Sequence, residues 1–265
     1  MTEKTFIHPT AIIEKGAEIG EGCKIGPYCV IGPKVKLGED VELKAHVVIE
    51  GNTSIGDGTV VFPFASLGQI PQDLKYAGED SQLIIGKNNK IREYVTMNPG
   101  TADDKMKTVV GDNCLFMAST HVAHDCIVGN GVIMANCATI AGHVEVGDFA
   151  IIGGLAAVHQ FVRIGTGAMI GGMSGVEHDV VPFGLVKGDR AYLAGLNYIG
   201  LERRGFVKED IKTLMQMFKD VFEAEGVFAE KVEKATNDYK NNEIVMKVIS
   251  FINNKKEKGN ILKTK

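Results

Sequence analysis

The stretch AEIGEGCKIGPYCVIG, residues 17–32, repeats an isoleucine followed by a glycine at a spacing of six residues. The same spacing of large apolar residues runs from Ile7 to Val176 and includes 26 positions, with two interruptions. An α-helix repeats about every 3.6 residues and a strand about every two, so neither produces this period. A parallel β-helix of hexapeptides does, because each unit forms one short strand and one corner. We therefore predict an all-β fold of this kind.

Three six-residue units make one coil, so residues 18 apart should stack on successive coils. Two segments break the series. QIPQDLKYAGEDSQ, residues 69–82, fills the length of one coil without repeating, and NPGTADDKMK, residues 98–107, shifts the phase by one residue. We expect both to leave the coils as loops, where functional residues concentrate.

The repeat ends near Pro182, and the sequence after it has helical spacing. KEDIKTLMQMFKDVFEAEG (208–226) carries apolar residues at intervals of three and four, and NNEIVMKVISFINN (241–254) suggests another helix. We predict two domains, a β-helix over 1–190 and a small α-helical domain over 191–265. The second carries 14 Lys and Arg against 11 Asp and Glu, whereas the first carries 15 against 22.

Composition excludes several classes of protein. The net charge of −4 argues against nucleic acid as a partner. The five cysteines form no CxxC pair and no regular framework, so we interpret them as buried apolar side chains in a reducing compartment. The N-terminal sequence has no secretion pattern, and no apolar run approaches the roughly 18 residues of a membrane span. We expect a cytoplasmic protein without stable membrane insertion.

Four of the seven histidines fall close to one vertical line of the predicted prism: His121, His124, His143 and His159. Gly142 and Gln160 follow His124 by one and two coils, and two of the histidines flank them. A scaffold has no need of imidazoles in such a column. The arrangement indicates a site that handles protons or binds an oxyanion-rich ligand.

Two chemistries compete for these histidines. Carbonic anhydrases on the same kind of β-helix bind zinc through histidines, but they separate the pair by four residues and have a third well upstream. Here two residues separate His121 from His124, and the upstream His8 and His46 lie far from the column. We therefore favour acyl transfer with His124 as general base, and we expect no metal and no cofactor. Asp125 could orient His124 only if a corner separates them.

The sequence resembles the UDP-N-acetylglucosamine 3-O-acyltransferases of lipid A synthesis. The resemblance rests on motifs through nearly the whole chain: IHPTA (7–11), QDLKYAGE (72–79), IRE (91–93), HVAHDC (121–126), AGHVEVGDFAIIGG (141–154), VHQF (158–161) and RRGF (203–206). It implies a homotrimer of left-handed β-helices with active sites between subunits. It also implies transfer of a 3-hydroxyacyl chain from acyl carrier protein to the sugar 3-hydroxyl.

The resemblance also implies residue roles. His124 matches the base, Asp125 its support, and the Gly142 N–H the oxyanion donor. The positions that match substrate-binding groups are Gln72, Asp73, Lys75, His121, His143, His159, Gln160, Asn197, Arg203 and Arg204, the last three toward the nucleotide.

Gly154 and Gly172 are 18 residues apart, so they should stack and leave a groove for an apolar chain. In the family the position of Gly172 measures acyl length, and glycine there implies a longer chain. Two departures stand out: Ile199 replaces a glutamate, and Arg190 replaces a histidine of some relatives. The alternatives left open are a UDP-sugar N-acyltransferase, a coenzyme A-dependent acetyltransferase and a non-catalytic trimeric scaffold.

Overall fold

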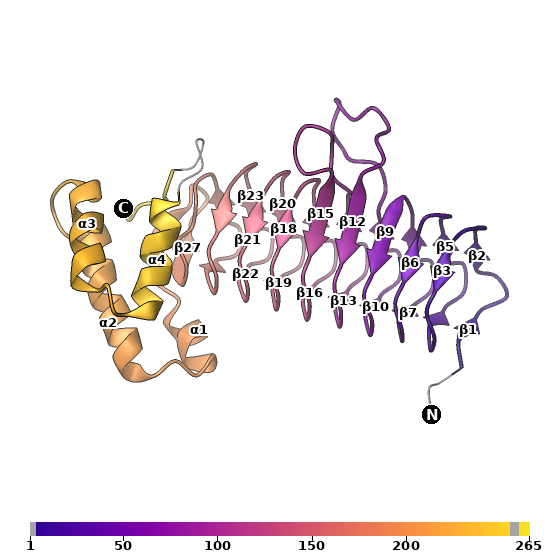
Figure 1. Cartoon of the computed structure of the whole chain (residues 1–265), viewed down its shortest axis with the longest axis horizontal. Coiled ribbons are helices and arrows are strands. Elements are labelled where there is room, and N and C mark those ends of the chain that lie inside the picture. The colour runs from indigo at the N-terminus through magenta and orange to yellow at the C-terminus, as the bar shows by residue number, and fades with distance from the viewer. Residues whose placement is uncertain (1–3, 255–259) are drawn as a thin grey trace.

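The structure, a computed structural model, describes residues 4–254 and 260–265. It is a long three-sided prism of short strands, with helices packed at the end opposite the N-terminus (Figure 1). From β1 to β27, every pair of hydrogen-bonded strands is parallel. The predicted parallel β-helix is confirmed.

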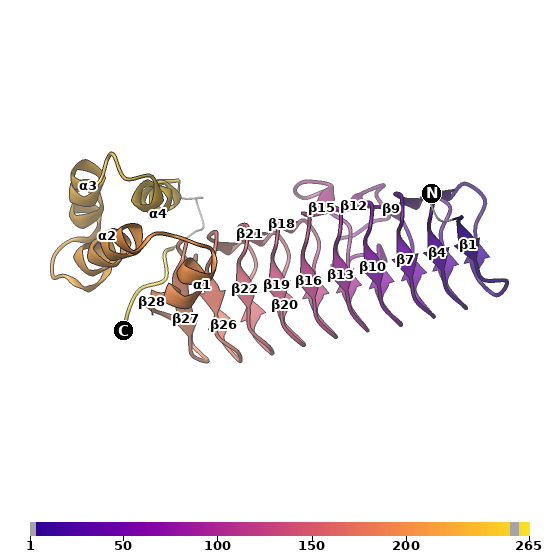
Figure 2. The same ribbon diagram turned by 90° about the horizontal axis from the view of Figure 1, so that it is seen from below.

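Three sheets form the three faces of the prism (Figure 2). Face A, the eleven-stranded sheet, consists of β1 Phe6–Ile7, β4 Lys24–Ile25, β7 Glu42–Leu43, β10 Val60–Val61, β13 Lys90–Ile91, β16 Leu115–Phe116, β19 Ile133–Met134, β22 Ile151–Ile152, β25 Met169–Ile170, β27 Gly184–Lys187 and β28 Tyr192–Leu196.

Face B, with nine strands, consists of β2 Ile12–Ile13, β5 Val30–Ile31, β8 Val48–Ile49, β11 Ser66–Leu67, β14 Thr96–Met97, β17 His121–Val122, β20 Thr139–Ile140, β23 Ala157–Val158 and β26 Gly175–Val176. Face C, with eight, consists of β3 Glu18–Ile19, β6 Lys36–Leu37, β9 Asn52–Ile55, β12 Gln82–Ile85, β15 Lys107–Val110, β18 Ile127–Val128, β21 Glu145–Val146 and β24 Arg163–Ile164.

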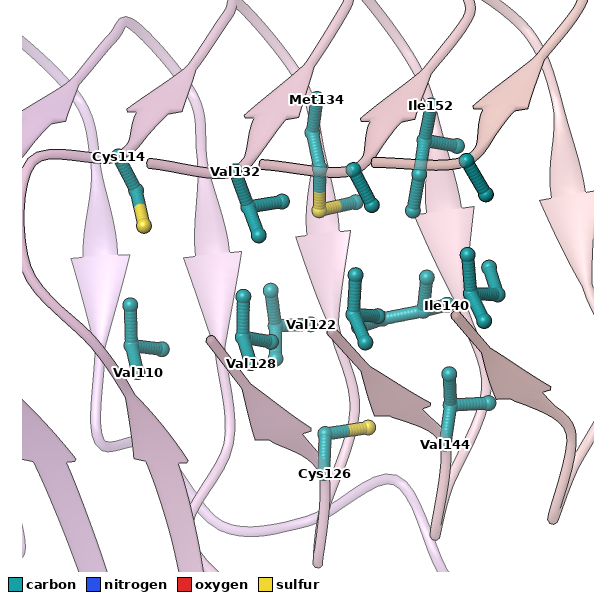
Figure 3. Packing of buried hydrophobic residues seen from close by; sticks show 14 of the residues in the cluster. Val110, Cys114, Val122, Cys126, Val128, Val132, Met134, Ile140, Val144 and Ile152 are labelled. Carbon is teal, nitrogen blue, oxygen red and sulfur yellow. The ribbon is translucent and has the colours of Figure 1, made fainter. Parts of the chain in front are cut away.

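Each of the 26 apolar residues of the sixfold series is the last residue of one of the strands β1 to β26. From Ile25 onward these side chains are buried, and they stack through the prism with smaller residues such as Cys114 and Val132 (Figure 3). Strand partners are 18 residues apart where no loop intervenes, as in the pair Ile133 and Ile151. Burial of one apolar side chain per strand explains why the period is so regular.

The chain passes from face B to face C along one edge of the prism, which we call edge BC. The two interruptions of the repeat, 69–82 and 98–107, both leave the prism here, after β11 and β14 (Figure 1). Several non-glycine residues at this edge turn the chain with positive φ, among them Asp125 at 58° and His143 at 65°. The left-handed conformation is unfavourable for residues other than glycine. These residues adopt it because the corner of each coil requires it.

The helices follow β28, which lies beyond residue 190 and pairs antiparallel with β27. They are α1 Tyr198–Arg203, α2 Lys208–Phe218, the π-helical continuation η1 Lys219–Glu223, α3 Phe228–Asp238 and α4 Glu243–Asn253. The two helices expected from spacing are confirmed, whereas the domain division at residue 190 stays a prediction. None of the helices in the described residues is both long and apolar enough to cross a membrane.

A buried ion pair ties the helices to the prism. Arg163, on face C, donates from Nε to Asp179 Oδ2 at 2.9 Å and from Nη1 to the carbonyl of Asn254 at 2.7 Å. Both charged side chains are almost fully buried. The guanidinium thereby binds the C-terminal end of α4, where the helix dipole favours a cation.

Candidate active site

A cleft of about 1120 Å³ lies at edge BC, between the two loops and the coils. It is lined by Gln72, Asp73, Leu74, Lys75, Asp103, Asp104, Lys105, His124, His143, Gln160 and Phe161. Two histidines of the column, His124 and His143, therefore face the cleft together with three of the loop residues expected to bind substrate. The motif QDLK and the histidine column, more than 40 residues apart in sequence, meet here.

His124 is held by its neighbour Asp125. Nδ1 of His124 lies 3.0 Å from Asp125 Oδ2, and both residues are buried. Side chains of adjacent strand residues diverge, but the positive φ of Asp125 forms a corner and turns its carboxylate back to the imidazole. The corner that the pairing of His124 with Asp125 requires is therefore present.

Asp125 is ionised because donors surround it. Its Oδ2 accepts from the Thr101 hydroxyl at 2.6 Å, and its Oδ1 accepts from the Lys105 N–H at 3.0 Å. Burial acts to raise the pKa of Asp125, but the hydrogen bonds from His124 and Thr101 outweigh it and lower the pKa to about 2. A carboxylate only accepts hydrogen bonds, so Nδ1 of His124 carries the hydrogen and Nε2 is left to act as a base.

Gly142 lies directly against the ring of His124, one coil further along. A Cβ added at Gly142 would come within 2.5 Å of Cε1 and 2.6 Å of Nε2 of His124. The Gly142 N–H makes no hydrogen bond to any part of the chain that the structure describes. An unpaired backbone donor beside a base is the arrangement that stabilises an oxyanion during acyl transfer.

His143 is held in a similar way by a residue of the 98–107 loop. Nδ1 of His143 lies 2.8 Å from Asp104 Oδ2. The ring stacks on Phe161 with centroids 4.3 Å apart and meets the ring of His124 edge-on at 4.9 Å. The two imidazoles thus lie side by side in the cleft, each with its own carboxylate.

The 69–82 loop contributes charged groups beside His124. Asp73 Oδ2 lies 3.8 Å from His124 Nε2. Lys75 Nζ pairs with Asp103 at 3.0 Å, which raises the pKa of Lys75, and this bond joins the two loops. Lys75 is solvent-exposed, so its ammonium remains accessible to a ligand.

The other histidines of the column do not line the cleft. His121 lies on face B with Nδ1 2.7 Å from Thr96 Oγ1, and burial, assisted by His124, lowers its pKa. His159 is exposed, with Nδ1 3.3 Å from the carbonyl of Gln160. Gln160 itself does line the cleft.

The expected nucleotide-binding residues lie elsewhere on the chain, beside the edge where face C passes to face A. The Arg204 guanidinium stacks over Phe149 at 4.3 Å, and burial lowers its pKa. Arg203 is exposed at the end of α1. Asn197 caps α1, accepting from the Gly200 N–H and donating to the carbonyl of Gly167. Within one chain these residues are not brought together with His124.

Gly154 and Gly172 stack on the edge between faces A and B. A Cβ at Gly172 would lie 3.2 Å from the carbonyl oxygen of Gly154, so the two positions are in direct vertical register. Face B separates this edge from the His124 cleft, so a chain running from one to the other would cross a single face. Of the two departures, Arg190 pairs with Glu177 and Ile199 is exposed.

His124, Asp125 and His143 bring possible metal-ligand atoms within 4.8 Å of one another. Both oxygens of Asp125 already accept hydrogen bonds from the protein, and Nδ1 of each imidazole faces a carboxylate. These oxygen and nitrogen atoms are thus already engaged by groups of the protein.

Residues 101–105 were missed by the sequence reasoning, although the segment was expected to be a functional loop. Thr101, Asp104 and Lys105 all bind groups of the cleft. The available signal was an acidic pair in a loop that leaves the coils beside the histidine column.

Comparisons with known proteins identify the family of the chain. The family described as bacterial transferase hexapeptide repeats matches residues 3–33 and 107–142, and the second domain of UDP N-acetylglucosamine O-acyltransferase matches residues 179–261. The acyl-(acyl-carrier-protein)–UDP-N-acetylglucosamine O-acyltransferase of Rickettsia rickettsii strain Sheila Smith is 59% identical over 93% of this chain and 94% of its own. The Rickettsia felis protein of the same name is 56% identical, with the same coverage.

Solved structures give the same picture. The UDP-N-acetylglucosamine acyltransferase of Campylobacter jejuni is 42% identical, with a TM-score of 0.91 over 98% of this chain and 99% of that one. The O-acyltransferase of Moraxella catarrhalis is 40% identical, with a TM-score of 0.93 over 97% and 99%. Similarity of this extent covers both the β-helix and the C-terminal helices.

Proposed function

The chain belongs to the family of UDP-N-acetylglucosamine O-acyltransferases, and from this premise we infer that it transfers an acyl chain from acyl carrier protein to UDP-N-acetylglucosamine. This reaction is the first step of lipid A biosynthesis. The observation that carries the assignment to this cleft is the contact of His124 with Gly142, because it joins a base to a backbone donor.

The reaction needs one proton to move twice. Nε2 of His124 removes the proton of the sugar 3-hydroxyl as that oxygen attacks the thioester carbonyl carbon. The carbonyl oxygen becomes an oxyanion, which accepts a hydrogen bond from the Gly142 N–H. The carbon–sulfur bond then breaks, and the departing thiolate takes the proton from His124. Asp125 stabilises the imidazolium between the two steps.

Substrate binding falls to the remaining groups. Gln72, Asp73, Lys75, His143 and Gln160 line the cleft and can bind the sugar and its pyrophosphate. His121 and His159 lie outside the cleft lining, and we assign them to the part of the site nearer the acyl donor. Gly154 and Gly172 leave space for the 3-hydroxyacyl chain.

We propose a homotrimer in which each site is shared by two subunits. The arginines expected at the nucleotide lie at a different edge from His124, so one subunit alone does not assemble the site. Face A also presents half-buried apolar side chains outward, namely Leu115, Ile133, Ile151 and Met169. An apolar face of this kind suits packing against a second copy.

The acyl carrier protein is the expected donor, and the helical part carries 14 basic against 11 acidic residues, which suits an acidic partner. All five cysteines are free; four are buried, whereas Cys137 is exposed, so the expectation that all five are buried is wrong for Cys137. Free thiols fit a reducing compartment, and we propose that the protein acts in the cytoplasm.

An acceptor assay tests the function. Purified protein is given a 3-hydroxyacyl carrier protein and either UDP-N-acetylglucosamine or its 3-amino analogue. We expect an ester at the 3-position of the natural sugar, with the amine acylated more slowly. Acylation of the amine alone would instead assign the protein to the N-acyltransferases.

A further inference from the structure

In segment 101–105, Thr-Ala-Asp-Asp-Lys, every residue bonds either to the coils or to the 69–82 loop. Its contacts with the rest of the protein include Thr101 to Asp125, Ala102 to Glu79, Asp103 to Lys75, Asp104 to His143 and Lys105 to Asp125. Only the first and last of these bonds reach the His124 pair. The bond from Asp104 reaches the second imidazole, and neither the repeat nor the family resemblance assigns it a role.

The contact between Asp104 and His143 is short and sheltered. Nδ1 to Oδ2 is 2.8 Å, and about a tenth of the His143 side chain is exposed. Lys105 Nζ pairs with the same Asp104 oxygen and also lies 3.4 Å from the Asp125 carbonyl. Phe161 stacks on the flat face of the imidazole, so the carboxylate and the phenyl ring together fix its plane.

The charge on Asp104 decides which nitrogen of His143 carries the hydrogen. Burial acts to raise the pKa of Asp104, but the hydrogen bonds from Lys105 and His143 prevail and lower the pKa. An ionised carboxylate has no hydrogen to donate, so Nδ1 must donate to it. Nε2 is then the nitrogen that His143 can offer to a ligand.

We propose that Asp104 is a positioning residue for the acyl transfer, which holds His143 in its Nδ1–H tautomer with Nε2 free to contact the acceptor sugar. This inference rests on the proposed function, since it assumes that the cleft binds the UDP-sugar. The site then contains two carboxylate–imidazole pairs, one for the base and one for the acceptor.

Kinetics distinguish positioning of the acceptor from a general effect on the loop. Asp104→Ala should raise KM for UDP-N-acetylglucosamine roughly tenfold while kcat and KM for the acyl carrier protein change less than about threefold, because losing a contact made equally in the ground and transition states raises KM and leaves kcat unchanged. Asp104→Asn should recover most of the affinity, since its amide oxygen can accept the same hydrogen bond. Asp80→Ala, which removes a carboxylate from the other loop where it pairs with Lys34, serves as the matched control.

The proposal would be overturned if kcat fell and both KM values rose by similar factors, or if none of the three changed. So would an asparagine variant as impaired as the alanine variant, because the acceptor oxygen would then be irrelevant.

A tautomer measurement provides a readout independent of turnover. Solid-state ¹⁵N spectra of protein labelled at the histidine rings should show His143 protonated at Nδ1, with the signal identified by its loss in His143→Gln. In Asp104→Ala the signal should shift toward the Nε2–H form that free imidazole prefers. A wild-type His143 in the Nε2–H form overturns the proposal even if the alanine variant does not fold.

Failure of the proposed function and failure of the role of Asp104 give different results. A wild-type protein that transfers no acyl chain would refute the function, whereas the tautomer of His143 can be read without any substrate.

Discussion

The imidazole of His124 occupies the space that a side chain at Gly142 would need. A Cβ at residue 142 would lie 2.5 Å from Cε1 and 2.6 Å from Nε2 of His124, closer than real Cβ contacts allow. Gly142 has no positive φ, so the turn itself does not require glycine here. The requirement comes from the ring, which places the proposed base directly beside the proposed oxyanion donor.

Gly142→Ala should therefore displace the His124 ring and lower kcat by about 10²-fold, since small misplacements of reacting groups are this costly. A double-mutant cycle checks the cause. In the His124→Ala background the methyl group meets no ring, so the second substitution should cost little more. If the two losses simply multiply, the effect of Gly142→Ala does not pass through His124.

Gly172→Met should shift selectivity toward shorter acyl chains. The side chain would project where Gly154 and Gly172 now leave the edge open, and each excluded methylene is worth about 1–3 kcal/mol in such pockets. Competition between carrier proteins with acyl chains of different length measures the ratio of kcat/KM directly. A uniform loss for all lengths would mean that Gly172 serves the corner alone.

Acid should remove the contribution of Asp125 to stability. Its pKa of about 2 in the folded protein lies below the ordinary value of 3.8, so the charged form stabilises the fold above about pH 4. That stabilisation, on the order of 2 kcal/mol, is lost as the pH falls through the folded pKa. The melting temperature of Asp125→Asn should thus lie well below wild type at pH 6 and approach it near pH 2. A gap that stays constant with pH would contradict this origin.

Shared sites predict complementation between inactive subunits. His124→Ala and the double variant Arg203→Ala/Arg204→Ala should each have little activity as homotrimers. Every mixed trimer contains one junction where an intact His124 cleft faces intact arginines, so co-expression should restore activity. Light scattering should give a trimer mass for all samples. Mixed trimers without activity would place both groups in the same subunit's site.

The fold was predictable because each strand buries one apolar residue at a fixed interval, and β1 to β26 end at the predicted positions. The same interval correctly stacked His124 under Gly142. The Asp104 contact with His143 was not predictable, because a loop outside the repeat has no register to read. The place of Arg204 was not predictable either, although the residue itself was named, because its guanidinium stacks on Phe149 from outside the repeat.

The most direct test of the account is the rate of acyl transfer by His124→Ala. If Nε2 of His124 removes the hydroxyl proton, the variant should keep the wild-type fold and trimer mass while kcat falls roughly 10²-fold or more. Single-turnover measurement with 3-hydroxyacyl carrier protein and saturating UDP-N-acetylglucosamine isolates the chemical step. Near-wild-type turnover in a correctly folded trimer would contradict the account and transfer the role of base to another group, with His143 the nearest candidate.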